Sequence, residues 1–354
     1  AQALMVTERL GELDGLPPDS STRAILDDMV PHAVNNRERD NIANFGGDPN
    51  RVMIYGQSGG GAKTTSLLGM QRAEGLFHAA AVQSGSALRL RTPEDGTKTA
   101  EAILSAMGLT KARARELQDI PFEMMVAAAS GLPAGNGFGP VLDGSVYTRH
   151  PFDPDAPPYS KNVPMIVSST LDDSALALTN FDLDMDGLLK VAQGLAGEYA
   201  QHVVSAYPDA FPGATPFKLQ ARMLTDRGFR GSAITQAERK AAQGGAPVYM
   251  YLVTYEAPCY GGKFGAVHGV DVELVLNRYG GDLTGDSAAA RDLADKMGAA
   301  WANFARTGNP NADGLPDWPA YDVRSRATLI VDKECRIETD PYGQVRRLWE
   351  EIRA

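Results

Sequence analysis

Short apolar runs alternate along this chain with longer segments in which apolar residues recur at helical spacing. The runs rich in apolar and β-branched residues are typical of buried strands, and they lie at 51–55, 80–83, 163–168 and 246–256. Segments of helical character lie at 62–70, 92–132, 183–245 and on the stretch that ends before Gly308. Strands that alternate with helices predict an α/β fold, with a mostly parallel central sheet covered by helices on both faces.

The length of the chain allows one domain or two. Its 354 residues could form two average domains, but large α/β enzymes often fold as one unit of this size. We expect a single α/β domain over residues 1–354, with helical insertions at approximately 92–132 and 183–245. The Met and Phe residues of the first insertion, in "FEMMVAAA", suit either a pocket or the core, and the core is the expected location for any one of them.

Charge and cysteine content narrow the possible partners. Asp and Glu (44) outnumber Lys and Arg (34), so the formal net charge is −10. This acidic balance argues against nucleic acid or an anionic membrane as a partner, and no apolar run approaches the roughly 18–20 residues that span a bilayer. Cys259 and Cys335 lie far apart and in no metal-binding spacing. We expect free thiols, no metal site and a cytoplasmic location; a single disulfide and a secreted or periplasmic location are the alternatives.

The segment "RVMIYGQSGGGAKTTSLL" places a serine between glycines, directly after a predicted strand and directly before a predicted helix. A strand–turn–helix unit around G-x-S-x-G is the nucleophile elbow, in which the turn is too sharp for side chains at the flanking positions. This geometry lifts the hydroxyl of Ser58 above the sheet. It also leaves the amide of Gly59 at a helix N-terminus, where partial positive charge favours an oxyanion.

Two other interpretations of this glycine-rich turn are weaker. A phosphate-binding loop needs G-x-x-x-x-G-K-[ST], and here Gly56 and Gly61 fit while Lys63 comes one residue late. The serine could also be incidental in a tight turn. The position of the motif between a strand and a helix favours the elbow.

A serine nucleophile needs a histidine base, which in this fold follows the serine and an acid along the chain. The histidines after Ser58 are His78, predicted inside a helix near the elbow, His150 in a loop, His202 in a helical stretch and His268. Only His268 lies in a glycine-rich loop after a strong strand and still leaves room for an acid before it. Elimination therefore predicts His268 as the base.

Two adjacent aspartates are candidates for the acid. Asp172 and Asp173 both follow the predicted strand at 163–168. Two neighbouring carboxylates cannot both point at one imidazole, so we expect one of them to face solvent or to cap a helix. Spacing alone does not choose between them.

These segments resemble the type-B carboxylesterases, the family that includes para-nitrobenzyl esterases and is related to cholinesterases. The resemblance runs in order from about residue 38 to 322, and it rests on "NIANFGGDPNRVMIYGQSGGGAKT", "GLFHAAAVQSGSAL", "FGPVLDG", "VPMIVSSTLDDSAL", "GAVHGVDVELVL" and "WANFARTGNPN" with "DWPAYD". It implies an α/β-hydrolase fold, with Ser58 as nucleophile and His268 as base. The family's acidic motif aligns with Asp172-Asp173-Ser174 and implies Asp173 as the acid, where the family usually has Glu.

The resemblance also implies a longer N-terminus. Members of the family carry there the first sheet strands and an H-G-G-G-type loop that completes the oxyanion hole, and residues 1–40 contain no such loop. Of the expected donors, only the amide of Gly59 is identified. We therefore expect either that the sequence is a fragment or that residues 1–37 are remodelled.

The combined interpretation is a serine ester hydrolase without a cofactor, acting on small to medium hydrophobic esters through an acyl-enzyme, as a monomer or a homodimer. The two helical insertions are expected to wall its pocket. A non-catalytic binding protein of the same fold is a second hypothesis, favoured only by the missing loop. An amidase or acyltransferase with the same triad is a third.

Overall fold

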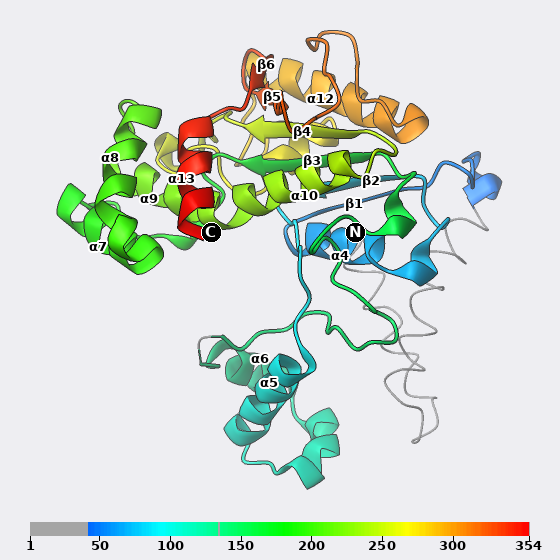
Figure 1. Ribbon diagram of the computed structural model, residues 1–354, viewed down its shortest axis with the longest axis vertical. Helices are drawn as coiled ribbons and strands as arrows, with labels where there is room; N and C mark the ends of the chain where they lie inside the picture. Colours follow the sequence, from blue (N-terminus) through cyan, green and yellow to red (C-terminus); the bar gives the residue numbers. More distant parts are fainter. Residues whose placement is uncertain (1–41, 134, 354) are drawn as a thin grey trace.

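The computed structural model describes residues 42–133 and 135–353, and within them six strands form one sheet (Figure 1). The strands follow chain order across the sheet and are β1 (Met53–Gln57), β2 (Ala79–Gln83), β3 (Met165–Thr170), β4 (Val248–Val253), β5 (Ala327–Val331) and β6 (Arg336–Thr339). Strands β1 to β5 are parallel, and β6 pairs antiparallel with β5. The prediction of a mostly parallel sheet is confirmed.

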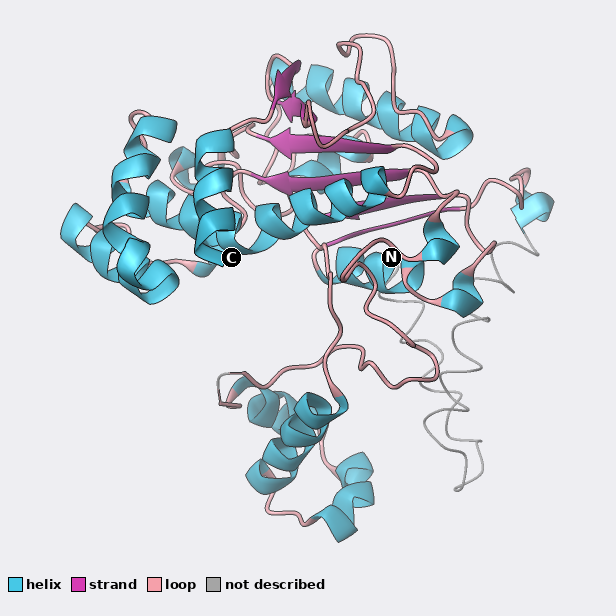
Figure 2. Ribbon diagram, in the orientation of Figure 1, coloured by secondary structure: helices cyan, strands magenta, loops and turns pink. Residues whose placement is uncertain are grey.

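Helices occupy most of the connections between the strands (Figure 2). The α-helices are α4 (Gly59–Leu68), α5 (Pro93–Ala106), α6 (Phe122–Ser130), α7 (Met185–Ala196), α8 (Ala200–Ala210), α9 (Pro216–Thr225), α10 (Gly231–Ala242), α11 (Val270–Val275), α12 (Ala288–Thr307) and α13 (Gly343–Arg353). A 3₁₀ segment, η5 (Lys111–Asp119), lies between α5 and α6, and one π-helical turn, η9 (Asp226–Arg230), joins α9 to α10.

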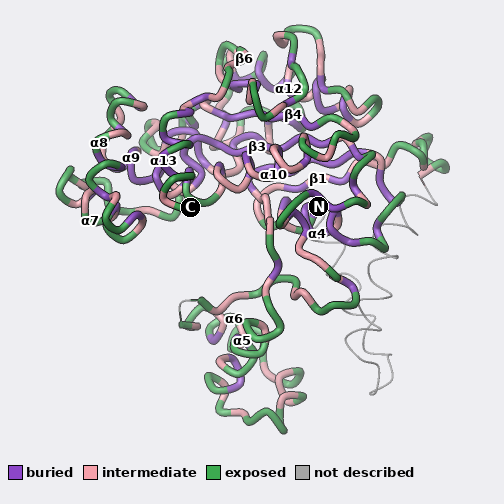
Figure 3. Tube along the Cα trace, viewed as in Figure 1, coloured by how far each residue is buried: buried purple, intermediate pink, exposed green. Residues whose placement is uncertain are grey.

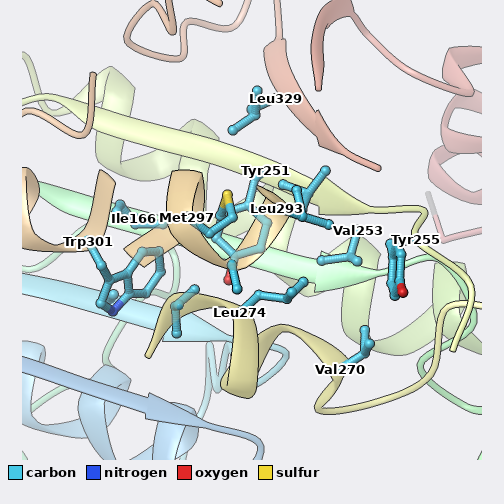
Figure 4. Packing of buried hydrophobic residues seen from close by; sticks show 14 of the residues in the cluster. Ile166, Tyr251, Val253, Tyr255, Val270, Leu274, Leu293, Met297, Trp301 and Leu329 are labelled. Atoms are coloured by element: carbon cyan, nitrogen blue, oxygen red, sulfur yellow. The ribbon is translucent and has the colours of Figure 1, made fainter. Parts of the chain in front are cut away.

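Both faces of the sheet are buried. Strands β2 to β5 are apolar or small at nearly every position, and each of their residues is buried, as expected for parallel strands covered on both sides (Figure 3). On one face Ile166 and Tyr251 pack against α11 and α12, where Leu293 and Met297 supply the helical stripe expected from the sequence (Figure 4). On the other face, Val167 and neighbouring residues pack against α4 and α10.

The first strand differs from its predicted position. The apolar run suggested 51–55, but β1 covers Met53–Gln57, because Gly56 and Gln57 still pair with Val82 and Gln83 of β2. Pairing with a neighbour, rather than apolar character, therefore decides where this strand ends. The elbow turn is correspondingly shorter, and α4 begins at Gly59.

The insertion between β2 and β3 forms a helical lobe that extends away from the sheet, drawn in cyan to teal in Figure 1. Thr92 caps α5 reciprocally with Asp95, which fixes the start of the lobe. Much of the lobe is exposed in Figure 3. Phe122 is 76% exposed and Met124 is 53% exposed. The expectation that the Met and Phe residues of this segment belong to the core is wrong for these two, because the lobe is too small to bury them.

The second insertion is helical as predicted, over α7 to α10. Its helices share a third apolar cluster with the C-terminal helix α13, whose Trp349 is buried and donates its indole N–H to the hydroxyl of Tyr207 at 2.7 Å. We did not predict β5, β6 or α13 from the sequence. Cys259 and Cys335 form no disulfide with each other, as expected. Across the residues that the structure describes, every helix is too short or too polar to cross a bilayer.

Candidate active site

The elbow is a tight strand–turn–helix unit. Ser58 stands between β1 and α4 with φ 57° and ψ −121°, a backbone conformation that L-residues rarely adopt. A Cβ atom at Gly56 would lie 2.3 Å from the carbonyl carbon of Gly60. Glycine is therefore required at Gly56, as the motif predicts. A Cβ atom at Gly59 would meet no described atom within 4 Å, so the space above the first turn of α4 is open.

The end of β2 holds the elbow from one side. The amide of Ser58 donates to the carbonyl oxygen of Gln83 at 2.8 Å. A Cβ atom at Gly85 would lie only 2.3 Å from the carbonyl oxygen of Ser58. This close backbone contact places Ser58 beside Ser84, the residue between these two partners.

Asp173 and His268 are in direct contact. Asp173 Oδ1 lies 2.7 Å from His268 Nδ1, and the carboxylate is buried. Asp173 Oδ2 accepts from the hydroxyl of Ser84 at 2.9 Å and from the amide of Thr170 at 3.0 Å. The loop after β3 thus carries Asp173 and the loop after β4 carries His268, and the two predicted residues are in contact.

Two contacts bring the elbow against this acid–base pair. Ser84, next to Ser58 in space, donates to Asp173. On the other side, a Cβ atom at Gly269 would lie 3.7 Å from Gln57 Nε2, so the residues adjoining Ser58 and His268 lie against each other. The predicted nucleophile, acid and base therefore lie at the same edge of the sheet, at the carboxyl ends of its parallel strands.

Asp172 has a different environment from that predicted. It neither faces solvent nor caps a helix: its side chain is fully buried and forms an ion pair with Arg222, with Arg222 Nε 2.9 Å from Asp172 Oδ1. Its Oδ2 accepts from the amide of Ala266 at 2.9 Å. The expectation for the second aspartate is wrong, because a cation 50 residues away neutralises the carboxylate inside the fold.

The electrostatics suit a histidine base. Burial lowers the pKa of His268, but the hydrogen bond and charge of Asp173, together with the charge of Asp271, outweigh it and raise the pKa above its ordinary value. The contact between Nδ1 and a carboxylate favours the tautomer with the proton on Nδ1, which leaves Nε2 as a proton acceptor. The ring of Phe229, on the η9 turn, packs against the imidazole with centroids 5.2 Å apart.

A third buried carboxylate, that of Asp271, lies three residues after His268 in the chain. Asp271 Oδ2 accepts from the hydroxyl of Tyr251 at 2.7 Å and from the side-chain Nε2 of Gln83 at 2.9 Å. Burial raises the pKa of Asp271, with these donors opposing the rise. Sequence analysis missed both Asp271 and Ser84. The available signals were an acidic residue between two valines on the helix that follows His268 and the serine directly after β2.

The remaining histidines have other contacts. His78 lies in a turn before β2 rather than in the predicted helix, and its Nδ1 accepts from the amide of Val52 at 3.2 Å. His150 is in a loop as predicted and accepts from the amide of Leu90 at 3.1 Å. His202 lies on α8. Each of these three histidines therefore lies outside the contact between Asp173 and His268.

The expected remodelling or loss of the N-terminal oxyanion loop falls on residues 1–40, which lie outside the described residues. Gly59, the donor predicted from the sequence, is the first residue of α4. In the part of the chain that the structure describes, no group of three or more His, Cys, Asp or Glu side chains could hold a metal ion.

Comparison with known proteins decides the family. The sequence profile described as "Carboxylesterase family" matches residues 39–349. This chain belongs to the carboxylesterase family. The resemblance inferred from the motifs is therefore confirmed. The para-nitrobenzyl esterase of Bacillus subtilis (strain 168) is 30% identical over 328 residues, covering 87% of this chain and 64% of that protein. The phenmedipham hydrolase of Pseudarthrobacter oxydans is 29% identical, covering 83% of this chain and 62% of that protein.

Solved structures of this family have the same fold. A crystal structure of a Geobacillus stearothermophilus carboxylesterase superposes with a TM-score of 0.75 at 33% identity, covering 88% of this chain and 66% of that one. A structure titled "PNB esterase" gives a TM-score of 0.70 at 30% identity. The α/β-hydrolase fold is confirmed. This carboxylesterase-family chain spans just under two thirds of the length of these relatives.

Proposed function

We propose that this protein hydrolyses carboxylic esters through an acyl-enzyme formed on Ser58, with His268 as general base and Asp173 as the acid that orients it. The contact of 2.7 Å between His268 Nδ1 and Asp173 Oδ1 is the observation that carries the proposal. It supports the arrangement that activates a serine, because an imidazole fixed by a carboxylate on one nitrogen presents the other nitrogen as the base.

In the first half of the reaction, Ser58 Oγ attacks the carbonyl carbon of the ester while His268 Nε2 takes the hydroxyl proton. The imidazolium is stabilised by Asp173, which stays ionised. As the tetrahedral intermediate collapses, the imidazolium gives its proton to the departing alcohol. In the second half, the same nitrogen takes a proton from water, which cleaves the acyl-enzyme and releases the acid.

The negative charge that develops on the carbonyl oxygen in the tetrahedral intermediate is stabilised by hydrogen-bond donors that are in place before the reaction. The amide of Gly59 is our candidate donor, because it begins α4 and the helix dipole adds positive potential there. The open space above Gly59 leaves room for the oxygen.

The substrate class that we propose is a small to medium hydrophobic ester. Similar proteins bear the names para-nitrobenzyl esterase and phenmedipham hydrolase. In this chain, the half-buried ring of Phe229 packs on the imidazole. This apolar side chain favours an uncharged substrate beside the base.

The test is hydrolysis of p-nitrophenyl butyrate by the full chain and by two serine variants. Ser58→Ala should abolish release of p-nitrophenol. Ser205→Ala removes an exposed hydroxyl on α8 and should leave the rate unchanged, so it controls for purification and folding. Hydrolysis that survives Ser58→Ala, or no hydrolysis by the unmodified chain, would contradict the proposal.

A further inference from the structure

The loops that carry Asp173 and His268 are tied together by the residue next to the acid. The amide of Asp172 donates to the carbonyl oxygen of Ala266 at 3.0 Å, and the amide of Ala266 donates back to Asp172 Oδ2 at 2.9 Å. Asp172 and Val267 also form an isolated parallel β-bridge. Asp173 directly follows Asp172, and His268 directly follows Val267. The side chains of Asp173 and His268 are in contact.

Arg222, on α9, holds the Asp172 carboxylate from the opposite side. Its Nε lies 2.9 Å from Asp172 Oδ1 and its Nη2 lies 3.5 Å from Asp172 Oδ2. The guanidinium carbon lies 4.7 Å from the ring centre of Phe211, and the side chain is nearly buried. A planar cation fixed in this way sets both the position and the plane of the carboxylate.

The approach of the carboxylate to the base loop depends on a glycine. Gly265 has φ +77°, and a Cβ atom there would lie 2.3 Å from Asp172 Oδ2. The backbone of this loop is thus shaped around the carboxylate, which contacts Arg222 on one side and the amide after Gly265 on the other.

We propose that Asp172 and Arg222 are a positioning pair, which sets the distance between the acid loop and the base loop and so the hydrogen bond between Asp173 and His268. The catalytic role of this pair rests on the proposed function. The pair acts by holding the acid loop and the base loop in position. The charges that raise the pKa of His268 are those of Asp173 and Asp271. Neither Asp172 nor Arg222 touches the proposed nucleophile.

The buried setting explains why the cation is needed. Burial raises the pKa of Asp172, and the charge of Arg222 opposes that rise. If the cation is lost or displaced, the carboxylate loses its principal partner and the loop can relieve the cost by moving. Movement of Asp172 shifts Asp173 directly, because the two residues are adjacent.

The experiment compares Arg222→Lys with Arg346→Lys. Both variants keep the positive charge and lose a two-point contact to a buried or half-buried aspartate, since Arg346 binds Asp340 at 2.8 and 2.9 Å. Arg346 lies on α13, and its ion-pair partners are Asp340 and Glu350 rather than residues of either loop. The pKa of the His268 imidazole is measured in each folded protein by NMR after labelling histidine with ¹⁵N, without substrate. Turnover of p-nitrophenyl butyrate is measured in parallel.

We expect Arg222→Lys to lower the pKa of His268 toward that of a free imidazole, and to lower kcat by about tenfold to a hundredfold with little change in KM. Arg346→Lys should leave both quantities unchanged. An unchanged imidazole titration in folded Arg222→Lys overturns the proposal. If Arg222→Lys does not fold, Asp172→Asn replaces it, with the same expected results and the same overturning result. Absence of ester hydrolysis in the unmodified chain would instead contradict the proposed function. The titration of the His268 imidazole would still test the positioning role of Asp172 and Arg222.

Discussion

Asp173 and His268 stand 95 residues apart in the chain, but their side chains are joined by a contact of 2.7 Å at the carboxyl edge of the sheet. The adjacent residue, Asp172, is bound to Arg222 and to the backbone of the base loop. Two neighbouring carboxylates thus point in different directions. We assign Asp173 to the catalytic reaction and Asp172 to the positioning of the two loops.

Replacing the acid should be far more damaging than replacing its neighbour. Asp173→Asn keeps the shape but can hold the imidazole in the wrong tautomer, and we expect kcat to fall by roughly four orders of magnitude, as for the same change in serine protease triads. Asp172→Asn should cost about tenfold to a hundredfold through misplacement. Steady-state kinetics on a p-nitrophenyl ester compares them. Equal or reversed losses would contradict the assignment of Asp173.

Ser84 should contribute to activity without taking part in proton transfer. Its hydroxyl donates to the Asp173 carboxylate at 2.9 Å, and hydrogen bonds to charged groups are each worth about 1.5–3 kcal/mol. We expect Ser84→Ala to lower kcat/KM by about tenfold or more. Ser66→Ala is the control, because Ser66 is also buried but its hydroxyl bonds to Ala62 on α4 and to Tyr147 rather than to Asp173. Equal effects of the two variants would argue against a role for Ser84.

The rate should rise with pH through the titration of His268. The base must be unprotonated, and its pKa lies above the ordinary 6.5 because of Asp173 and Asp271. We therefore expect the acid limb of the profile of kcat/KM against pH to have its midpoint above 6.5. Asp173→Asn should move that midpoint down wherever residual activity allows a measurement. A midpoint at or below 6.5 in the unmodified protein would contradict this electrostatic account.

The same titration predicts a change in stability. A histidine whose pKa is raised by folding contributes stability that is fully present below its unfolded pKa, near 6.5, and is lost as pH rises through the folded pKa. Subtracting the unfolding free energies of Asp173→Asn from those of the unmodified protein should therefore give a difference that shrinks across that pH window. Urea denaturation at a series of pH values measures it. If this difference in unfolding free energy grew with pH, it would contradict a raised pKa of His268 in the folded protein.

The elbow can be tested through its backbone. A Cβ atom at Gly56 would lie 2.3 Å from the backbone of Gly60, so Gly56→Ala should destabilise the fold by about 3 kcal/mol. Gly194→Ala is the matched control. It lies on α7 with nothing within 4 Å of the new atom, and it should stabilise by up to about 1 kcal/mol. Thermal unfolding of both variants checks the contrast, and a harmless Gly56→Ala would argue against the tight turn.

Much of this arrangement could be predicted because its signals are local. The elbow is a strand, a turn and a helix within about twenty residues, and its glycines follow from close backbone contact at Gly56. The position of His268 followed from chain order and from the loop after a strong strand. Local pattern also predicted the helical segments of both insertions.

The rest depends on contacts between distant residues. The choice between Asp172 and Asp173 depends on Arg222, which local spacing cannot reveal. The end of β1 depends on its pairing with β2. The exposure of Phe122 depends on how far the helical lobe extends from the sheet, which its own periodicity does not encode.

The central claim is that Ser58 carries the acyl group, and trapping that group tests it most directly. The full chain is mixed with excess p-nitrophenyl butyrate, quenched in acid within the first turnover and digested, and the peptides are analysed by mass spectrometry. We expect a butyryl group on the peptide containing Ser58, and none there in Ser58→Ala. A butyryl group on another residue while hydrolysis proceeds, or hydrolysis by Ser58→Ala at the unmodified rate, would contradict the account.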